Sequence, residues 1–188
     1  MEKKNIIEEI RKFVEEECKK PTSKYGYEPY KYHFIPVVNY AVELAKKLNA
    51  DIEVVELAAL LHDIGAIIEG RGNHHITGAE VAEKKLKELG CPIEKVKKIK
   101  NCILSHRGSK SLKPDSIEAQ IIIDADAMSN FDNLPGIFKA AFIYENQTQG
   151  QAKETTRQKL MNTFNKIIFE ESRDLIKPKY DAAMLLLN

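Results

Sequence analysis

Apolar residues recur at spacings of three and four along most of the chain, and this periodicity restricts the fold more than any other feature. No segment alternates apolar and polar residues as a half-buried strand would, and the apolar run 121–123 is too short to outweigh its surroundings. The periodic positions include Ile6, Ile10, Phe13, Val14, Val37, Val38, Ala41, Leu44, Ala45, Leu48, Val54, Val55, Ala58 and Leu61. The sequence therefore predicts an all-α fold.

Local signals suggest where some of these helices begin and end. Thr77 is a candidate N-cap for a helix that starts beside it, and Gly90 and Pro92 separate that helix from the next. The long amphipathic segment after Gly150 is expected to break at Pro178. Helices are expected from Pro92 to about 105, from 117 to about 129 and from 135 to about 146, with a polar connection over 108–114.

Size and charge narrow the class of protein. A chain of 188 residues with 43% hydrophobic and 30% charged side chains has the balance of one globular domain over 1–188. Its 29 basic and 28 acidic residues argue against a general nucleic-acid or membrane-surface binder, so no nucleic-acid partner is expected. No apolar stretch approaches the roughly 18 residues that span a bilayer, and we expect a cytoplasmic protein without a membrane partner.

The three cysteines suggest no disulfide framework. Cys18, Cys91 and Cys102 are odd in number and form no C-x-x-C spacing. We interpret them as reduced, small hydrophobic residues rather than as metal-binding thiolates.

The stretch ELAALLHDIGAIIEG at 56–70 ends an apolar helix on an imidazole beside a carboxylate. Burying His62 and Asp63 without partners would cost several kcal/mol. In one interpretation, Asp63 closes the helix and a backbone carbonyl satisfies His62. In the other, both bind a metal ion, because imidazole and carboxylate are common ligands of divalent cations.

All five histidines lie between positions 33 and 106, next to apolar helix faces or helix ends, which favours a shared role. A carboxylate from a later helix would complete such a site. On that helix Asp126 continues the stripe of Ala119, Ile122 and Ile123, whereas Asp124 lies on another face. We therefore prefer Asp126 to Asp124 as the inward carboxylate, the alternative being that both are solvated.

The order of these residues resembles the HD-domain superfamily of metal-dependent phosphohydrolases. A lone His is followed by a His-Asp doublet, two further His and a late Asp in an A-D-A context. The pieces are His33, HDIGA at 62–66, HHITGAEVA at 74–82, ILSHRG at 103–108 and DADAMSNFD at 124–132. The resemblance covers about 30–135, so we expect an HD-type core there, with C-terminal helices at about 136–188 packed on it.

The resemblance implies a compact helical bundle with a divalent metal at its centre, held by His33, His62, Asp63 and Asp126. Members with extra histidines often hold two metals, and His74 and His106 match those positions. His74 is preferred to His75 because it precedes Gly78 by four residues, as in the H-x-x-x-G pattern of the family. Ala66 stands where the cyclic-dinucleotide branch has a lysine, and no G-Y-P follows His106, so that branch is not supported.

The chemistry expected of these residues is hydrolysis of a phosphate ester or anhydride by metal-activated water. A divalent ion can lower the pKa of water from 15.7 to about 7. Asp63 and His62 are the expected catalytic residues, with Asp63 bridging the ions in a binuclear site. The ligand types suit one or two ions of Mn, Fe, Co, Ni or Zn better than Mg.

The substrate is expected to be a small phosphorylated molecule, with a nucleotide weakly favoured over a sugar phosphate. Arg107 and Arg71 are the candidate substrate-binding residues, because guanidinium groups bind phosphate oxygens in pairs. Tyrosines that precede His33 could stack on a base: Tyr25, Tyr27, Tyr30 and Tyr32. A di-iron HD-like oxygenase, a catalytically silent metal-binding regulatory module and a homodimeric assembly remain open alternatives.

Overall fold

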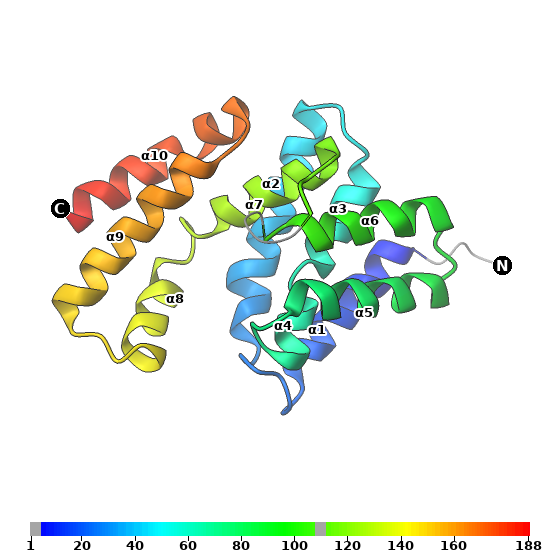
Figure 1. Ribbon diagram of the computed structural model, residues 1–188, viewed down its shortest axis with the longest axis horizontal. Coiled ribbons are helices and arrows are strands. Elements are labelled where there is room, and N and C mark those ends of the chain that lie inside the picture. The colour runs from blue at the N-terminus through cyan, green and yellow to red at the C-terminus, as the bar shows by residue number, and fades with distance from the viewer. Residues whose placement is uncertain (1–4, 108–111) are drawn as a thin grey trace.

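The computed structural model describes residues 5–107 and 112–188, and within them it contains helices and no strand, which confirms the all-α prediction. Figure 1 shows the elements α1 to α7 grouped on one side and the last helices on the other. The elements are α1 Ile6–Lys19, η1 Tyr30–Phe34, α2 Ile35–Lys47, α3 Ile52–Leu61, α4 Ile64–Glu69, α5 His74–Glu88, α6 Ile93–Ser105, α7 Ile117–Ser129, α8 Leu134–Lys139, η2 Ala140–Tyr144, α9 Gln149–Lys166 and α10 Glu170–Leu187.

Several helices begin at side chains that satisfy the free backbone N–H groups of the first turn. Asp51 accepts a hydrogen bond from the backbone N–H of Val54 at the start of α3. Ser116 does the same for Ala119 at the start of α7. Thr148 and Gln151 form a reciprocal capping box at the start of α9.

The core lies around α3, which packs against α1, α2, α6 and α7. Seven of its ten residues are buried, so it is apolar on almost every side. Such a helix is stable only inside a ring of others, because no face of it is polar enough to meet solvent. The three cysteines are buried and form no disulfide among the described residues, and burial raises the pKa of Cys102 to about 12.

The structure corrects two predicted helix boundaries. The helix assigned to Thr77 begins three residues earlier, at His74, because the Thr77 hydroxyl donates a hydrogen bond to Glu69 instead of capping the helix. Pro178 does not break its segment but lies inside α10. The roughly 3 kcal/mol that an internal proline costs is offset by the burial of Ile176, Ala183 and Leu187.

The chain instead breaks at 167–169, between α9 and α10. Both oxygens of the buried Asp124 carboxylate accept backbone N–H groups there, from Ile168 at 2.8 Å and Phe169 at 2.9 Å. α9 and α10 therefore fold back on each other as a pair that is anchored to α7 (Figure 1).

Gly65 permits the close approach of α4 to the start of α5. A Cβ atom at this position would lie 2.2 Å from the carbonyl oxygen of His74 and 2.6 Å from the amide nitrogen of Gly78. Both contacts are with backbone, which cannot rotate away as a flexible side chain can. The HDIG sequence therefore needs its glycine for packing, not for an unusual backbone angle.

We expect Gly65→Ala to lower the free energy of unfolding by about 3 kcal/mol, the upper end of the usual cost of overpacking. For a chain of this length that is a fall in Tm of roughly 6–12 °C, measurable by differential scanning calorimetry. Gly150→Ala is the matched control, because a Cβ there meets nothing within 4 Å. Equal melting temperatures for the two variants would contradict the packing role.

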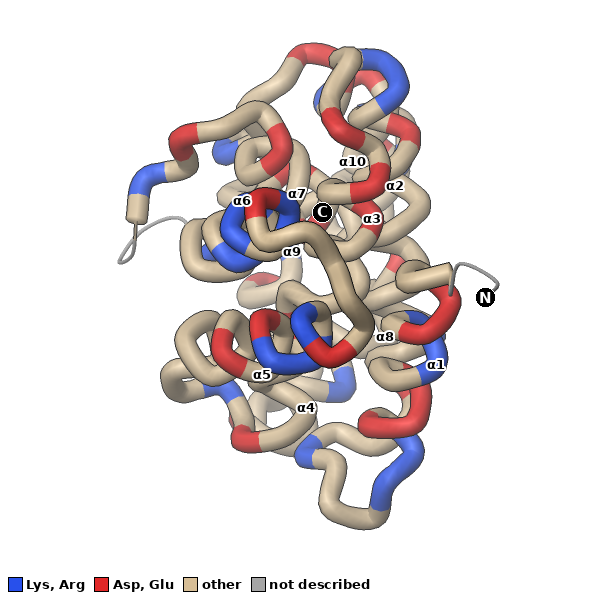
Figure 2. Tube along the Cα trace, turned by 90° about the vertical axis from the view of Figure 1, so that its right-hand side faces the viewer, with Lys and Arg blue, Asp and Glu red and all other residues tan. Residues whose placement is uncertain are grey.

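Basic and acidic residues are interspersed along the tube in Figure 2, without a face of one sign in that view. No helix in the described part of the chain has the length and hydropathy to cross a bilayer. The polar connection predicted over 108–114 falls partly on 108–111, outside the described residues.

Candidate metal centre

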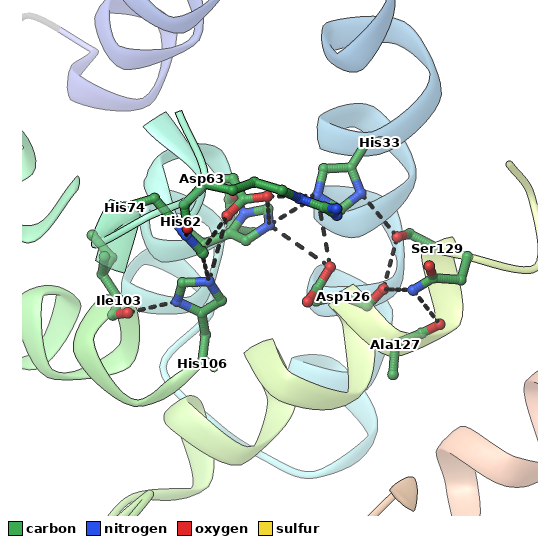
Figure 3. A network of polar contacts seen from close by, with 12 residues as sticks. His33, His62, Asp63, His74, Ile103, His106, Asp126, Ala127 and Ser129 are labelled. Carbon is green, nitrogen blue, oxygen red and sulfur yellow. Dashed lines mark hydrogen bonds and ion pairs between the residues drawn. The ribbon is translucent and has the colours of Figure 1, made fainter. Parts of the chain in front are cut away.

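Four histidine rings and two carboxylates converge where the ends of several helices meet (Figure 3). They are the six residues singled out in the sequence as metal ligands. His33 comes from η1, His62 follows α3, Asp63 precedes α4, His74 begins α5, His106 follows α6, and Asp126 lies on α7. The break between α3 and α4 at the His-Asp doublet turns both side chains toward the other four.

The first half of the cluster, here called the His33 group, contains His33, His62, Asp126 and one oxygen of Asp63. Nε2 of His33 lies 3.3 Å from Oδ2 of Asp63 and 3.6 Å from Oδ1 of Asp126. Nε2 of His62 lies 3.8 Å and 3.9 Å from the same two oxygens. The two Nε2 atoms are 3.1 Å apart.

The second half, the His106 group, contains His74, His106 and the other oxygen of Asp63. Oδ1 of Asp63 lies 3.1 Å from Nε2 of His74 and 3.4 Å from Nε2 of His106. These two Nε2 atoms are 3.2 Å apart. Asp63 thus stands between the groups and offers one carboxylate oxygen to each.

The other ring nitrogen of three histidines is engaged by the backbone three residues earlier. Nδ1 of His62 donates to the Ala59 carbonyl at 2.8 Å, Nδ1 of His74 to Arg71 at 3.1 Å, and Nδ1 of His106 to Ile103 at 2.6 Å. A carbonyl can only accept, so Nδ1 carries the proton. In its neutral form each ring would therefore present an Nε2 lone pair to the centre.

Nδ1 of His33 is also held by a hydrogen bond, in this case to Ser129, a residue that the sequence did not predict. Nδ1 of His33 lies 3.1 Å from the Ser129 hydroxyl, which donates its own proton to the carbonyl of Asp126 at 2.7 Å. Because its proton is already used, the hydroxyl accepts from Nδ1–H of His33. Figure 3 shows this chain of contacts on α7.

The electrostatics of the cluster favour positive charge between its rings. Burial alone would raise the pKa of Asp63, but the surrounding imidazoles hold it well below the usual range of a carboxyl. Burial lowers the pKa of His62 to about 4, so this ring is neutral near pH 7. Neutral Nε2 atoms only 3.1–3.2 Å apart repel through their lone pairs unless a proton or metal ion lies between them.

The donor set fits divalent metals in two adjacent positions. Three ligand atoms of each group lie within 4.8 Å of one another: those of His33, His62 and Asp63, and those of Asp63, His74 and His106. Imidazole nitrogen combined with carboxylate oxygen suits the transition metals from Mn to Zn. The hydrogen bonds to Nδ1 are the usual way in which a protein orients metal-binding histidines.

The two near alternatives in the sequence lie outside the cluster. Asp124 is occupied by the backbone N–H groups of Ile168 and Phe169, as described above. His75 is absent from both ligand groups. Asp126 and His74, in contrast, lie beside other candidate ligands, at 3.6 Å from Nε2 of His33 and 3.1 Å from Oδ1 of Asp63 respectively.

A cleft of about 900 Å³ opens onto the cluster, and its lining includes Asp63 and Asp126. Arg71 and Arg107, the candidate substrate-binding residues, also line it, and Arg107 donates to the Gly72 carbonyl at 2.7 Å. A pocket of this size is within the range of small-molecule sites. The cleft therefore gives a small molecule access to the candidate ligands.

The tyrosines before His33 divide into two pairs. Tyr25 and Tyr32 line the cleft. Tyr27 and Tyr30 instead stack on each other with ring centroids 5.6 Å apart, and Tyr30 is buried. Only the first pair is placed to meet a ligand.

The cleft has a second wall that the sequence did not predict, built by α8, η2 and α9. Lys159 of α9 lines it, although it stands 33 positions after Asp126 in a segment without a motif. Nothing in the local sequence distinguishes Lys159 from the other lysines on the surface. Lys159 reaches the cleft because α9 packs beside α7 and α8.

Comparison with known sequences agrees with this centre. A family model for the HD domain matches residues 30–130, which include all six clustered side chains. Ribonuclease Y of Mycoplasma mycoides subsp. mycoides is 38% identical over 99 residues, which are 52% of this chain and 18% of that protein. Ribonuclease Y of Borrelia garinii subsp. bavariensis is 39% identical over 90 residues, 46% of this chain and 16% of that protein. The chain thus spans less than a fifth of the length of these relatives.

Solved structures share the fold over nearly the whole chain. Bacillus subtilis YpgQ has a TM-score of 0.77 at 19% identity, covering 100% of this chain and 94% of that one. The same protein solved in complex with ADP has a TM-score of 0.71 at 21% identity and covers 96% and 92%. A predicted HD-superfamily hydrolase from an uncultured Thermotogales bacterium has a TM-score of 0.62 at 26% identity and covers 96% and 88%. With the family model matching more than half of its length, the chain belongs to the HD-domain family of metal-dependent phosphohydrolases.

Proposed function

We propose that this protein hydrolyses a phosphate anhydride of a nucleotide, using water and one or two divalent metal ions. The observation that carries the proposal is the double cluster around Asp63, in which four Nε2 atoms and two carboxylates converge at the end of an open cleft. The His33 group would hold one ion and the His106 group the other. Divalent ions supply a Lewis acid for a phosphoryl oxygen and activate water for attack on phosphorus.

The remaining residues of the chain bind and orient. His62, with its pKa of about 4 and no exposed surface, is suited to be a ligand rather than a general acid at neutral pH. Asp63 is suited to bridge two ions, because its oxygens point to different groups. Arg71 and Arg107 line the route by which an anionic substrate reaches the centre.

Two comparisons favour a nucleotide. YpgQ, which shares the fold over nearly the whole length of the chain, has been solved with ADP. The ribonuclease Y relatives, as their name says, act on a polymer of nucleotides. The cleft adds Tyr25 and Tyr32, whose rings could stack on a base, and its volume accommodates a nucleotide better than an extended polymer.

Turnover of metal-reconstituted protein tests the proposal. Metal-free protein would be loaded in turn with Mn, Fe, Co, Ni or Zn and offered nucleoside mono-, di- and triphosphates, cyclic nucleotides and a short RNA. We expect metal-dependent release of phosphate or diphosphate from nucleotides that contain an anhydride. A product that forms only in the presence of oxygen would indicate the di-iron oxygenase, and metal binding without any turnover would indicate the silent module.

Metal binding is expected to release protons and to strengthen as the pH rises. Burial alone would lower the pKa of His33 and His106, but the Asp63 carboxylate raises both above the ordinary value of histidine. A metal must displace these protons, so affinity increases with pH until the raised pKa values are passed and then levels off. Calorimetric titration of Mn²⁺ at pH about 6 and about 8, in buffers of different ionisation enthalpy, measures both effects. Equal affinity at both pH values would contradict the expectation.

A further inference from the structure

The cleft beside the metal centre has two walls of different origin. One belongs to the HD-type core and carries the candidate ligands and Arg71. The other is built by α8, η2 and α9, in the part of the chain beyond the residues 30–130 that match the family model. Lys159 on α9 faces the cleft from this second wall.

Four basic side chains outside the histidine cluster line the cleft, and they differ in what they contact. Lys139 forms an ion pair with Glu28 at 2.6 Å. Arg107 is held by the Gly72 carbonyl. Arg71 and Lys159 form no ion pair with any carboxylate in the described residues, so these two are available to a ligand.

Arg71 and Lys159 come from separate parts of the chain but line the same cleft, one from each of its two walls. Partial loss of solvent around the Lys159 ammonium lowers its pKa, and the positive charge of Arg71 lowers it further. The carboxylates of Asp126 and Glu145, which line the same cleft, act in the opposite direction. The fold therefore brings two cations into the cleft that the candidate ligands also line.

Such an arrangement is unfavourable without an anion. Like charges in a cleft repel more strongly than in bulk water, because less solvent screens them. Glu145 lines the same cleft but accepts a hydrogen bond from Gln147, and Asp126, the other carboxylate that acts on Lys159, lies against the candidate ligand His33. Divalent ions in the centre would add further positive charge, which Asp63 and Asp126 alone do not neutralise. The surplus is suited to a substrate with several negative charges.

We propose that Arg71 and Lys159 together bind the second phosphoryl group of the substrate, next to the phosphoryl group that is attacked at the metal centre. This inference rests on the proposed function and deepens it, because it names the residues that would hold the phosphoryl group that is not attacked. Arg71 supplies a planar pair of donors from the core, and Lys159 a single ammonium from α9. A monophosphate would occupy only the metal centre and leave both cations without a partner.

Binding of imidodiphosphate, an analogue of diphosphate that resists hydrolysis, tests the inference independently of turnover. Calorimetry on the Mn²⁺-loaded protein would compare wild type, Arg71→Met and Lys159→Met, with inorganic phosphate as the second ligand. Lys166→Met is the matched control, because this lysine is exposed on the same helix but does not line the cleft. Thermal melting of each variant checks that the fold is intact.

We expect Lys159→Met and Arg71→Met each to weaken imidodiphosphate binding about 10- to 100-fold, the usual value of a charge-assisted hydrogen bond. Their affinity for inorganic phosphate should change by less than about threefold, and Lys159→Arg should recover much of the loss. An unchanged Kd for imidodiphosphate, or an equal loss for inorganic phosphate, would overturn the inference.

The two proposals fail in different ways. If wild type hydrolyses a nucleotide but Lys159→Met binds imidodiphosphate as tightly as Lys166→Met does, the inference is wrong and the proposed function stands. If wild type hydrolyses no phosphate compound while its imidodiphosphate affinity still depends on Lys159, the anion site stands and the proposed hydrolysis is wrong.

Discussion

Asp63→Asn is expected to remove both metal ions and to lower kcat/KM for nucleotide hydrolysis by at least about 10³-fold. The two oxygens of Asp63 lie 3.1–3.8 Å from the Nε2 atoms of all four clustered histidines, so one substitution affects both groups. Loss of the charge that bridges two cations should cost several kcal/mol of transition-state stabilisation, and 1.36 kcal/mol is a factor of ten in rate. Inductively coupled plasma mass spectrometry of metal-loaded, dialysed protein gives the number of ions per chain.

His106→Ala is the informative comparison, since His106 belongs to only one group. It should retain one ion, near the intact His33 group, whereas wild type retains two. A wild-type value of one ion that His106→Ala leaves unchanged would rule out the second site. Full metal occupancy in Asp63→Asn would refute the whole assignment, because no other described carboxylate touches both groups.

The sequence predicted the helical class, the six clustered side chains and most helix boundaries for understandable physical reasons. A period of 3.6 residues is a local property, so α7 could be assigned at 117–129 from its own residues. The ordered His and Asp motifs are also local, and their resemblance to a known family supplied the long-range pairing. His33 and Asp126 are far apart in the chain, and their spacing alone does not predict that the two side chains lie side by side.

What the sequence did not predict depends on contacts between distant segments. His33 lies in a π-helical turn, η1, whose wider hydrogen-bonding pattern has no residue signature, although such turns often occur at functional sites. α5 begins at His74 rather than beside Thr77, whose hydroxyl donates a hydrogen bond to Glu69 instead of capping the helix. Lys159 lines the cleft because of how α9 packs on the rest of the chain. A helical pattern in the sequence predicts a helix but not how that helix is oriented against its neighbours.

The hydrogen bonds to Nδ1 of the candidate ligands include both local contacts and a contact between distant segments. Three histidines reach back to a carbonyl three residues earlier, a contact that the adjoining helix end or turn supplies without any special side chain. His33 has no such carbonyl contact and uses Ser129 from another helix. The Ser129 hydroxyl in turn donates to the backbone carbonyl of Asp126. The orientation of His33 on η1 therefore depends on the turn of α7 that carries Asp126.

The last prediction separates two acids that stand two residues apart on α7. Asp126→Asn is expected to weaken metal binding at least 10- to 100-fold while leaving the melting temperature of the metal-free protein nearly unchanged. Its carboxylate is partly exposed and lies against His33 and His62, so its charge serves the centre rather than the core. Asparagine keeps the volume and removes the charge.

Asp124→Asn should do the reverse, because this side chain points roughly 160° away around the helix. Its two oxygens accept the backbone N–H groups of Ile168 and Phe169, and an amide can accept only one of them. The N–H group left without a partner in a buried position should cost about 1–3 kcal/mol, with metal affinity unchanged. Mn²⁺ titration and thermal melting of both variants settle the assignment: loss of metal binding in Asp124→Asn with retention in Asp126→Asn would exchange the two roles, and would mean that α7 unwinds near the centre when metal binds.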